Sequence, residues 1–338
     1  MNVSSVTFQG HTFPIRLSAK VYTPKQSKTK NNNAARNNLT LLITHANGFH
    51  KELWEPILRR LFERQASVEA NSIDHNVGWW IEKAIAIDAQ NHGDSALLNK
   101  GHLNKDVFYW TEHAKDIQAI LGQIHIGESK LVGVGHSFGG SSLLLTEIER
   151  PGSFYAIAAI DPTIRGNLSI VQGIADKARR RKNGWESEQA AREYFLSKDL
   201  FAVWDKEILG LHIEHGLYST VADNAQKMLA LKCDPAYEAA TFSGWKEPIQ
   251  IIFSRIKEIS ARVRIINGQV SVICPPDHAK KLSSMMKNAD FRVVEKTGHL
   301  VVMENPVETE KELAAFLDEI SANWKISPKS PFPPNPRL

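Results

Sequence analysis

Ser137 stands in the run G-H-S-F-G at residues 135–139, which fits the pattern G-x-S-x-G of a nucleophilic serine. The apolar residues 131–134 before it predict a buried parallel strand, and residues 141–149 after it predict a helix. In such a strand-turn-helix, the bend lifts the serine hydroxyl clear of the sheet. Side chains at Gly135 and Gly139 would collide across the bend. The run therefore predicts a serine nucleophile; the alternative is a glycine-rich turn that only packs.

A serine hydroxyl needs a base to take its proton and an acid to orient that base. In this kind of fold the chain order is serine, acid, histidine. His299 follows the last predicted strand, in the run T-G-H at 297–299, and is the predicted base. The acid is less direct, because the Gly-x-x-Asp slot after the penultimate strand holds Ser271. We predict Asp161, which ends a buried strand, with Asp277 as the second choice.

Acyl transfer also needs preplaced donors for the oxygen that becomes negative. One predicted donor is the N–H of Phe138, the residue after the nucleophile. The other comes from the loop H-A-N-G-F at 45–49, which follows a buried strand at 39–44 and offers Asn47, Gly48 and Phe49. The sequence leaves that choice open. The alternative is an ordinary strand-to-helix connection.

Three other groups of residues have simpler explanations. Asp88, His92 and Asp94 lie at loop starts and are interpreted as structural. His212, Glu214 and His215 lack a further ligand, so we predict no metal and no cofactor. The basic run Arg179, Arg180 and Arg181 is either a solvated helix face or a site for the phosphates of a large anionic substrate.

Strands and helices alternate along most of the chain, which predicts an α/β fold. We expect a first core part at residues 1–162, a helical cap without a buried strand at 163–262, and a second core part at 263–325. Residues 326–338 form a proline-rich tail that is expected to be disordered. A polar loop is expected at residues 22–38.

Bulk properties exclude several classes of protein. The chain has 338 residues and a formal charge of only +4, which argues against a nucleic-acid binder. No apolar run approaches the roughly 20 residues that a membrane span needs. The start shows no secretory signal, and Cys233 and Cys274 are too few for a disulfide framework, so a reducing compartment is expected.

At these motifs the chain resembles the α/β-hydrolase superfamily, whose fold is an eight-stranded, mostly parallel sheet with helices on both faces. The cap would be inserted after the sixth strand. Residues 45–54 and 231–235 (L-K-C-D-P) resemble, more narrowly, a fungal group. It contains a peroxisomal lipase, esterase-like proteins of toxin clusters and an acyl-CoA hydrolase of mycophenolic acid synthesis. In that group the acid follows the strand after the nucleophile helix, which supports Asp161.

The resemblance implies a serine hydrolase of acyl esters or thioesters, best described as a peroxisomal acyl-CoA thioesterase of fungal lipid or secondary metabolism. A lipase or carboxylesterase using the same residues is the near alternative. A ligand-binding homologue without turnover is the alternative from another class. The terminal tripeptide Pro336-Arg337-Leu338 predicts recognition by a peroxisomal import receptor, although proline departs from the usual small residue. Otherwise a cytoplasmic location is expected, and the oligomeric state stays open.

Overall fold

The computed structural model describes residues 1–25, 37–67, 78–164, 168–221 and 226–323. Most of the polar loop expected at 22–38 lies outside these ranges, and strands occupy both of its ends. The proline-rich tail, with Pro336-Arg337-Leu338, also lies outside them.

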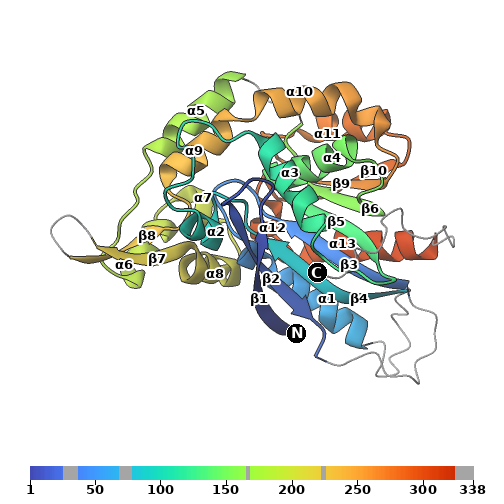
Figure 1. The fold of residues 1–338 in the computed structure, drawn as a ribbon, viewed down its shortest axis with the longest axis horizontal. Coiled ribbons are helices and arrows are strands. Elements are labelled where there is room, and N and C mark those ends of the chain that lie inside the picture. Colours follow the sequence, from blue (N-terminus) through green and yellow to red (C-terminus); the bar gives the residue numbers. More distant parts are fainter. Residues whose placement is uncertain (26–36, 68–77, 165–167, 222–225, 324–338) are drawn as a thin grey trace.

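An eight-stranded sheet runs through the centre of the molecule (Figure 1). Its order is β1-β2-β4-β3-β5-β6-β9-β10. All strands run in one direction except β2, which is antiparallel to β1 and β4. The strands are β1 (Asn2–Gln9), β2 (Arg16–Thr23), β3 (Asn37–Thr44), β4 (Trp79–Ile87), β5 (Lys130–His136), β6 (Ala156–Ile160), β9 (Arg262–Gly268) and β10 (Ala289–Val294). The prediction of an eight-stranded, mostly parallel sheet is confirmed.

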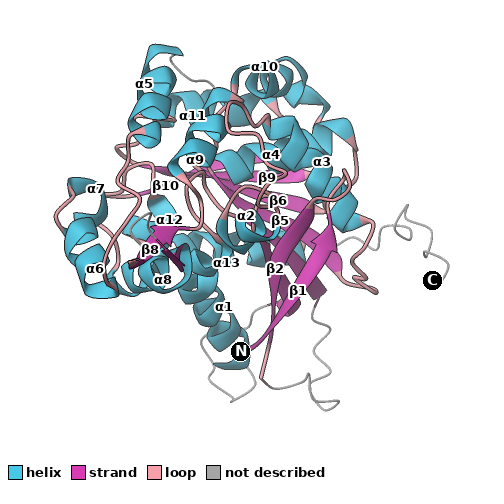
Figure 2. Ribbon diagram, turned by 60° about the vertical axis from the view of Figure 1, so that its left-hand side comes forward, coloured by secondary structure: helices cyan, strands magenta, loops and turns pink. Residues whose placement is uncertain are grey.

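Helices cover both faces of the sheet (Figure 2). Neighbouring residues of a strand point to opposite faces, so Leu41 joins one apolar cluster and Leu42 the other. Helices α1 (Glu55–Ser67) and α13 (Pro306–Ala322) pack in the first cluster; α3 (Trp110–Leu121), α4 (Phe138–Glu149), α10 (Lys246–Arg255) and α11 (Pro276–Met285) pack in the second. Shorter elements are the 3-10 helix η1 (Lys51–Trp54) with α2 (Gly93–Leu98) and α12 (Val301–Glu304).

The segment expected to form the cap lies between β6 and β9, which are the sixth and seventh strands of the main sheet along the chain. We refer to it as the cap. It contains α5 (Leu168–Arg179), α6 (Glu188–Leu196), α7 (Asp199–Ala202), α8 (Lys206–Gly216), α9 (Pro235–Ser243), α10 and η3 (Ile256–Glu258). It also carries an antiparallel pair, β7 (Leu217–Val221) and β8 (Lys227–Leu231), which the helical prediction missed. These strands are half exposed, so they lack the apolar run that marks a buried strand.

The parallel strands end at a common edge of the sheet. Thr44 pairs with Gly135, His136 with Ile160, and Ile160 with Ile266. The loops that leave these positions therefore lie side by side. Among the described residues, no helix is long and apolar enough to cross a membrane.

Candidate active site

Ser137 occupies the sharp bend between β5 and α4. Its φ of 53° lies in the left-handed region, which costs a non-glycine residue free energy, and strained backbone of this kind clusters at functional sites. A Cβ on Gly135 would lie 2.6 Å from Thr44 Oγ1, and one on Gly139 would lie 2.6 Å from the His45 carbonyl oxygen. The steric need for both glycines, predicted from the sequence, is confirmed.

The structure brings Ser137, His299 and Asp161 together. His299 Nε2 lies 2.8 Å from Ser137 Oγ, and His299 Nδ1 lies 2.6 Å from Asp161 Oδ1. Asp161 is fully buried, whereas the His299 side chain is 18% exposed. Because a carboxylate only accepts, Nδ1 carries the proton and Nε2 is left to accept from the serine hydroxyl. One imidazole thus connects a hydroxyl with a buried carboxylate.

Neutral donors from the end of β9 hold the Asp161 carboxylate. The Gly268 N–H donates to Oδ2 over 2.9 Å, and the Ser271 hydroxyl donates to Oδ1 over 2.9 Å. Asp161 also has a positive φ of 41°. The second-choice acid, Asp277, lies in the first turn of α11, and no hydrogen bond or ion pair within the described chain joins it to His299.

Two residues that sequence reasoning did not select fix the histidine loop. His136, beside the nucleophile, donates from Nε2 to the His299 carbonyl oxygen over 2.8 Å. Burial lowers the pKa of His136 to about 3, so its ring is neutral. Glu304 accepts the Gly298 N–H over 2.6 Å and the Leu300 N–H over 3.2 Å. The only sequence signal for His136 was its place inside the G-H-S-F-G run.

The loop after β3 offers fewer free N–H groups than the sequence suggested. Asn91 uses its amide nitrogen on other acceptors, so its oxygen faces His92 Nδ1 at 2.7 Å. Burial lowers the pKa of His92, and its Nε2 lies 2.9 Å from the Gly48 nitrogen, whose N–H points at it, and also 2.9 Å from Asn47 Oδ1. Gly48 stays a predicted oxyanion donor, although its N–H contacts the His92 ring in this structure. The Asn47 N–H has no acceptor among the residues that the structure describes. As the first residue of α4, Phe138 has no partner for its N–H inside the helix.

The three arginines of the predicted phosphate site have different surroundings. Arg181 forms an ion pair of 2.8 Å with Glu238, which is 4% exposed and packs against Gly48. Burial raises the pKa of Glu238, against the opposing charge of Arg181. Arg181 stays a prediction, with its charge paired to Glu238 in this structure. Arg179 and Arg180 are exposed and stay predictions.

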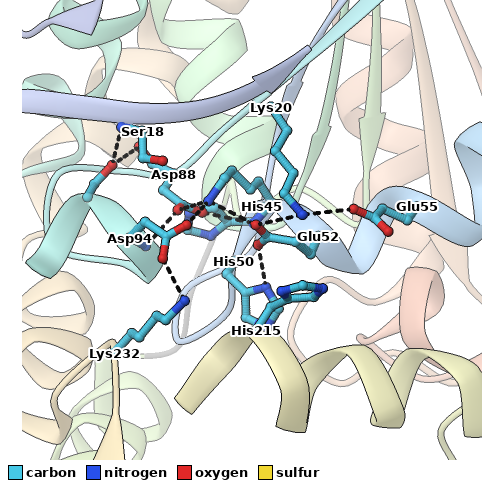
Figure 3. A network of polar contacts seen from close by, with 12 residues as sticks. Ser18, Lys20, His45, His50, Glu52, Glu55, Asp88, Asp94, His215 and Lys232 are labelled. Carbon is cyan, nitrogen blue, oxygen red and sulfur yellow. Dashed lines mark hydrogen bonds and ion pairs between the residues drawn. The ribbon is translucent and has the colours of Figure 1, made fainter. Parts of the chain in front are cut away.

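A largely buried charged network surrounds the start of η1, which follows the loop at 45–49, and Figure 3 shows its residues Glu52, Asp88 and Asp94. We call Lys51, Glu52, Asp88 and Asp94 the Lys51 cluster. Lys51 is 1% exposed, and its Nζ lies 2.7 Å from both Asp88 and Asp94 and 3.0 Å from Glu52. Burial lowers the pKa of Lys51, but the three carboxylates outweigh it and raise the pKa above its ordinary value. Lys232 of the cap contacts Asp94 over 2.6 Å. The cluster therefore connects the loop to the cap.

The remaining titratable candidates take no part in this arrangement. Cys233 and Cys274 are buried free thiols, and burial raises the pKa of each, which keeps them protonated. His212 stacks on His50 with ring centroids 5.6 Å apart. Within the described ranges, no group of three or more His, Cys, Asp or Glu is placed to bind a metal ion.

Comparisons with known proteins agree with this architecture. Residues 41–312 match the Alpha/beta hydrolase family. Peroxisomal membrane protein LPX1 of Saccharomyces cerevisiae is 27% identical over 312 residues, which cover 86% of this chain and 78% of LPX1. The Type I acyl-CoA thioesterase mpaH of Penicillium roqueforti is 28% identical over 200 residues, or 56% of this chain and 42% of that enzyme. The match thus spans less than half of the thioesterase.

Solved structures give the same picture. The peroxisomal alpha-beta-hydrolase Lpx1 of Saccharomyces cerevisiae superposes with a TM-score of 0.78 at 22% identity, covering 98% of this chain and 92% of that one. E-2-(acetamidomethylene)succinate hydrolase superposes with a TM-score of 0.71 at 17% identity, covering 94% and 100%. At these identities the likeness concerns the fold.

Proposed function

The chain belongs to the alpha/beta hydrolase family, and we propose that it is a serine hydrolase that cleaves acyl esters or thioesters through an acyl-enzyme. The fungal resemblance drawn from residues 45–54 and 231–235 is confirmed by the yeast and Penicillium relatives. The observation that carries the proposal is the His299 imidazole between Ser137 Oγ at 2.8 Å and Asp161 Oδ1 at 2.6 Å.

The chemistry follows from these contacts. Ser137 Oγ attacks the acyl carbon while His299 Nε2 takes its proton, and Asp161 stabilises the imidazolium that forms. The N–H groups of Phe138 and Asn47 hold the negative oxygen of the tetrahedral intermediate. The imidazolium then returns the proton to the departing alkoxide or thiolate. Water, activated by the same imidazole, releases the acid and restores Ser137.

We place an acyl-CoA thioester first among substrates, because one relative carries the name acyl-CoA thioesterase. The exposed Arg179 and Arg180 on the cap supply positive charge for CoA phosphates. A lipase or carboxylesterase is the second candidate, since the same three side chains serve oxygen esters. We propose a peroxisomal location from the terminal Pro336-Arg337-Leu338 and from the names of the yeast relative.

Labelling by a fluorophosphonate probe tests the nucleophile. We expect the native protein to be labelled and Ser137→Ala to lose labelling and turnover. Ser141→Ala is the matched control, because this buried serine lies in the first turn of α4, four residues after Ser137, and its hydroxyl donates to the Thr163 carbonyl oxygen. Persistent labelling of the folded Ser137→Ala variant would refute the assignment.

The substrate class is tested by comparing an acyl-CoA with a p-nitrophenyl ester of the same acyl chain. Faster turnover of the thioester supports the thioesterase, and turnover of the ester alone supports the esterase. A folded protein that is not labelled and turns over neither compound supports the ligand-binding alternative.

A further inference from the structure

A second hydroxyl lies beside the nucleophile. Thr163 Oγ1 is 3.4 Å from Ser137 Oγ, and no other described residue shares a hydrogen bond with this Thr163 hydroxyl. Thr163 is on the loop that leaves β6 and is 7% exposed, and Ser137 is 6% exposed, so the two hydroxyls meet in a place that is largely closed to water. The attacking oxygen therefore has a polar neighbour besides His299.

The partners of Ser137 decide which hydroxyl can donate in this contact. The serine hydroxyl carries one proton, and His299 Nε2 is the nearer acceptor, at 2.8 Å against 3.4 Å for Thr163 Oγ1. The serine proton therefore points to His299, and the Ser137 oxygen offers only lone pairs to its other neighbours. Thr163 can bind these lone pairs only as a donor.

The contact between the two hydroxyls is weak in the resting enzyme. Its length of 3.4 Å exceeds the roughly 2.7 Å of a good hydrogen bond between hydroxyls. Negative charge builds up on Ser137 Oγ as its proton moves to His299, and hydrogen bonds to charged oxygens are shorter and stronger. An interaction that is stronger in the transition state than in the ground state raises kcat.

The order of the sheet separates Thr163 from the loop that carries Asn47, a proposed oxyanion donor. Strand β5, which leads to Ser137, lies between β3 and β6. Asn47 follows β3 and Thr163 follows β6, so the two residues approach the nucleophile from different strands. The Thr163 hydroxyl thus contacts the attacking oxygen and is not one of the donors proposed for the substrate carbonyl oxygen.

We propose that Thr163 is a further catalytic residue, whose hydroxyl donates to Ser137 Oγ while this oxygen bears charge. As Oγ bonds to the acyl carbon, the serine proton passes to His299 Nε2, and Thr163 keeps its own proton throughout. The same donor stabilises Oγ again when water hydrolyses the acyl-enzyme and the bond between Oγ and the acyl carbon breaks. The proposal rests on the proposed function, because it needs Ser137 to be the nucleophile.

The test compares Thr163→Val, which keeps the branched shape without the hydroxyl, with Thr163→Ser, which keeps the hydroxyl. The measurements are kcat and KM on the p-nitrophenyl ester or acyl-CoA that the native enzyme turns over, and the rate of fluorophosphonate labelling. Thr163→Val should lower kcat about 10- to 100-fold at unchanged KM, as loss of a hydrogen bond to a charged group does. Labelling should slow by a similar factor, and Thr163→Ser should keep both rates close to the native values.

Each outcome separates this inference from its basis. Native kcat in folded Thr163→Val, whatever its KM, refutes the donor role and leaves Ser137 as the nucleophile. Equal losses in Thr163→Val and Thr163→Ser also refute it, because the hydroxyl then makes no difference. Should the valine variant not fold, Thr163→Ala takes its place, since alanine differs from serine only in lacking the hydroxyl. Labelling that persists in folded Ser137→Ala overturns the proposed function and this inference together.

Discussion

Asp161 and Asp88 are alike in type, burial and place in the fold, but they differ in partner. Both follow a parallel strand of the sheet directly, and both are fully buried. Asp161 binds an imidazole and neutral donors, whereas Asp88 binds the Lys51 ammonium over 2.7 Å. An imidazole can exchange a proton near neutral pH; an ammonium with a raised pKa does not. A buried aspartate at a strand end is thus assigned a role by what it contacts.

The same substitution at the two aspartates should separate rate from stability. Asp161→Asn should lower kcat about 10⁴-fold, with a small loss of stability, because it leaves no buried charge without a counter-ion. Asp88→Asn should do the reverse. It removes one of the three carboxylates that surround the buried Lys51 ammonium, and it should lower the free energy of unfolding by about 3 kcal/mol.

Steady-state kinetics and urea unfolding of both variants measure these effects. A stability loss as large for Asp161→Asn as for Asp88→Asn, or a comparable fall in kcat, would remove the distinction between the two aspartates.

A fall in pH should lower stability through buried neutral imidazoles. Burial lowers the pKa of His45, His113 and His136 to about 3. The unfolded chain binds protons at these residues near pH 6.5, so their contribution is present above that value and is lost as pH falls towards 3. Each costs about 1.4 kcal/mol per pH unit in this window.

Urea unfolding at pH 7.5, 6.5 and 5.5 checks this slope. His113→Phe should reduce the slope of the unfolding free energy against pH by the contribution of one protonating group. Neither ring nitrogen of His113 has a hydrogen-bond partner among the described residues, and the ring stacks on Phe138 at 4.9 Å. His102→Asn, at an exposed position, is the control and should leave the slope unchanged. Stability that does not vary with pH would contradict the prediction.

The contact between Lys232 and Asp94, at the exposed edge of the Lys51 cluster, should contribute least to stability. Lys232 contacts Asp94, which is 38% exposed and keeps Lys51 as a second partner. Lys232→Ala should lower the free energy of unfolding by about 0.5 kcal/mol, and the effect should shrink in high salt. A double-mutant cycle with Asp94→Ala measures the pair. A coupling free energy of several kcal/mol would show that this contact with the cap is as strong as the buried ion pairs.

Much of the site was visible in the sequence because it depends on local rules. The elbow at 135–139 needs glycine on both sides of a serine, and the flanking strand and helix follow from their apolar periods. Since parallel strands end at one edge, Asp161 and His299 could be selected from their places after β6 and β10. Their roles as acid and base stay predictions until variants are measured.

Only the tertiary structure decided which groups pair with one another in hydrogen bonds and ion pairs. The Gly48 N–H contacts His92, 44 residues away, and Ser271 donates to Asp161, 110 residues away. Arg181 is paired with Glu238 of α9. A side chain or N–H can satisfy its hydrogen-bonding need with many groups of equal chemistry, and only packing selects the one that is near. The residue types therefore set what chemistry the chain has available, and the fold set which groups are free to perform it.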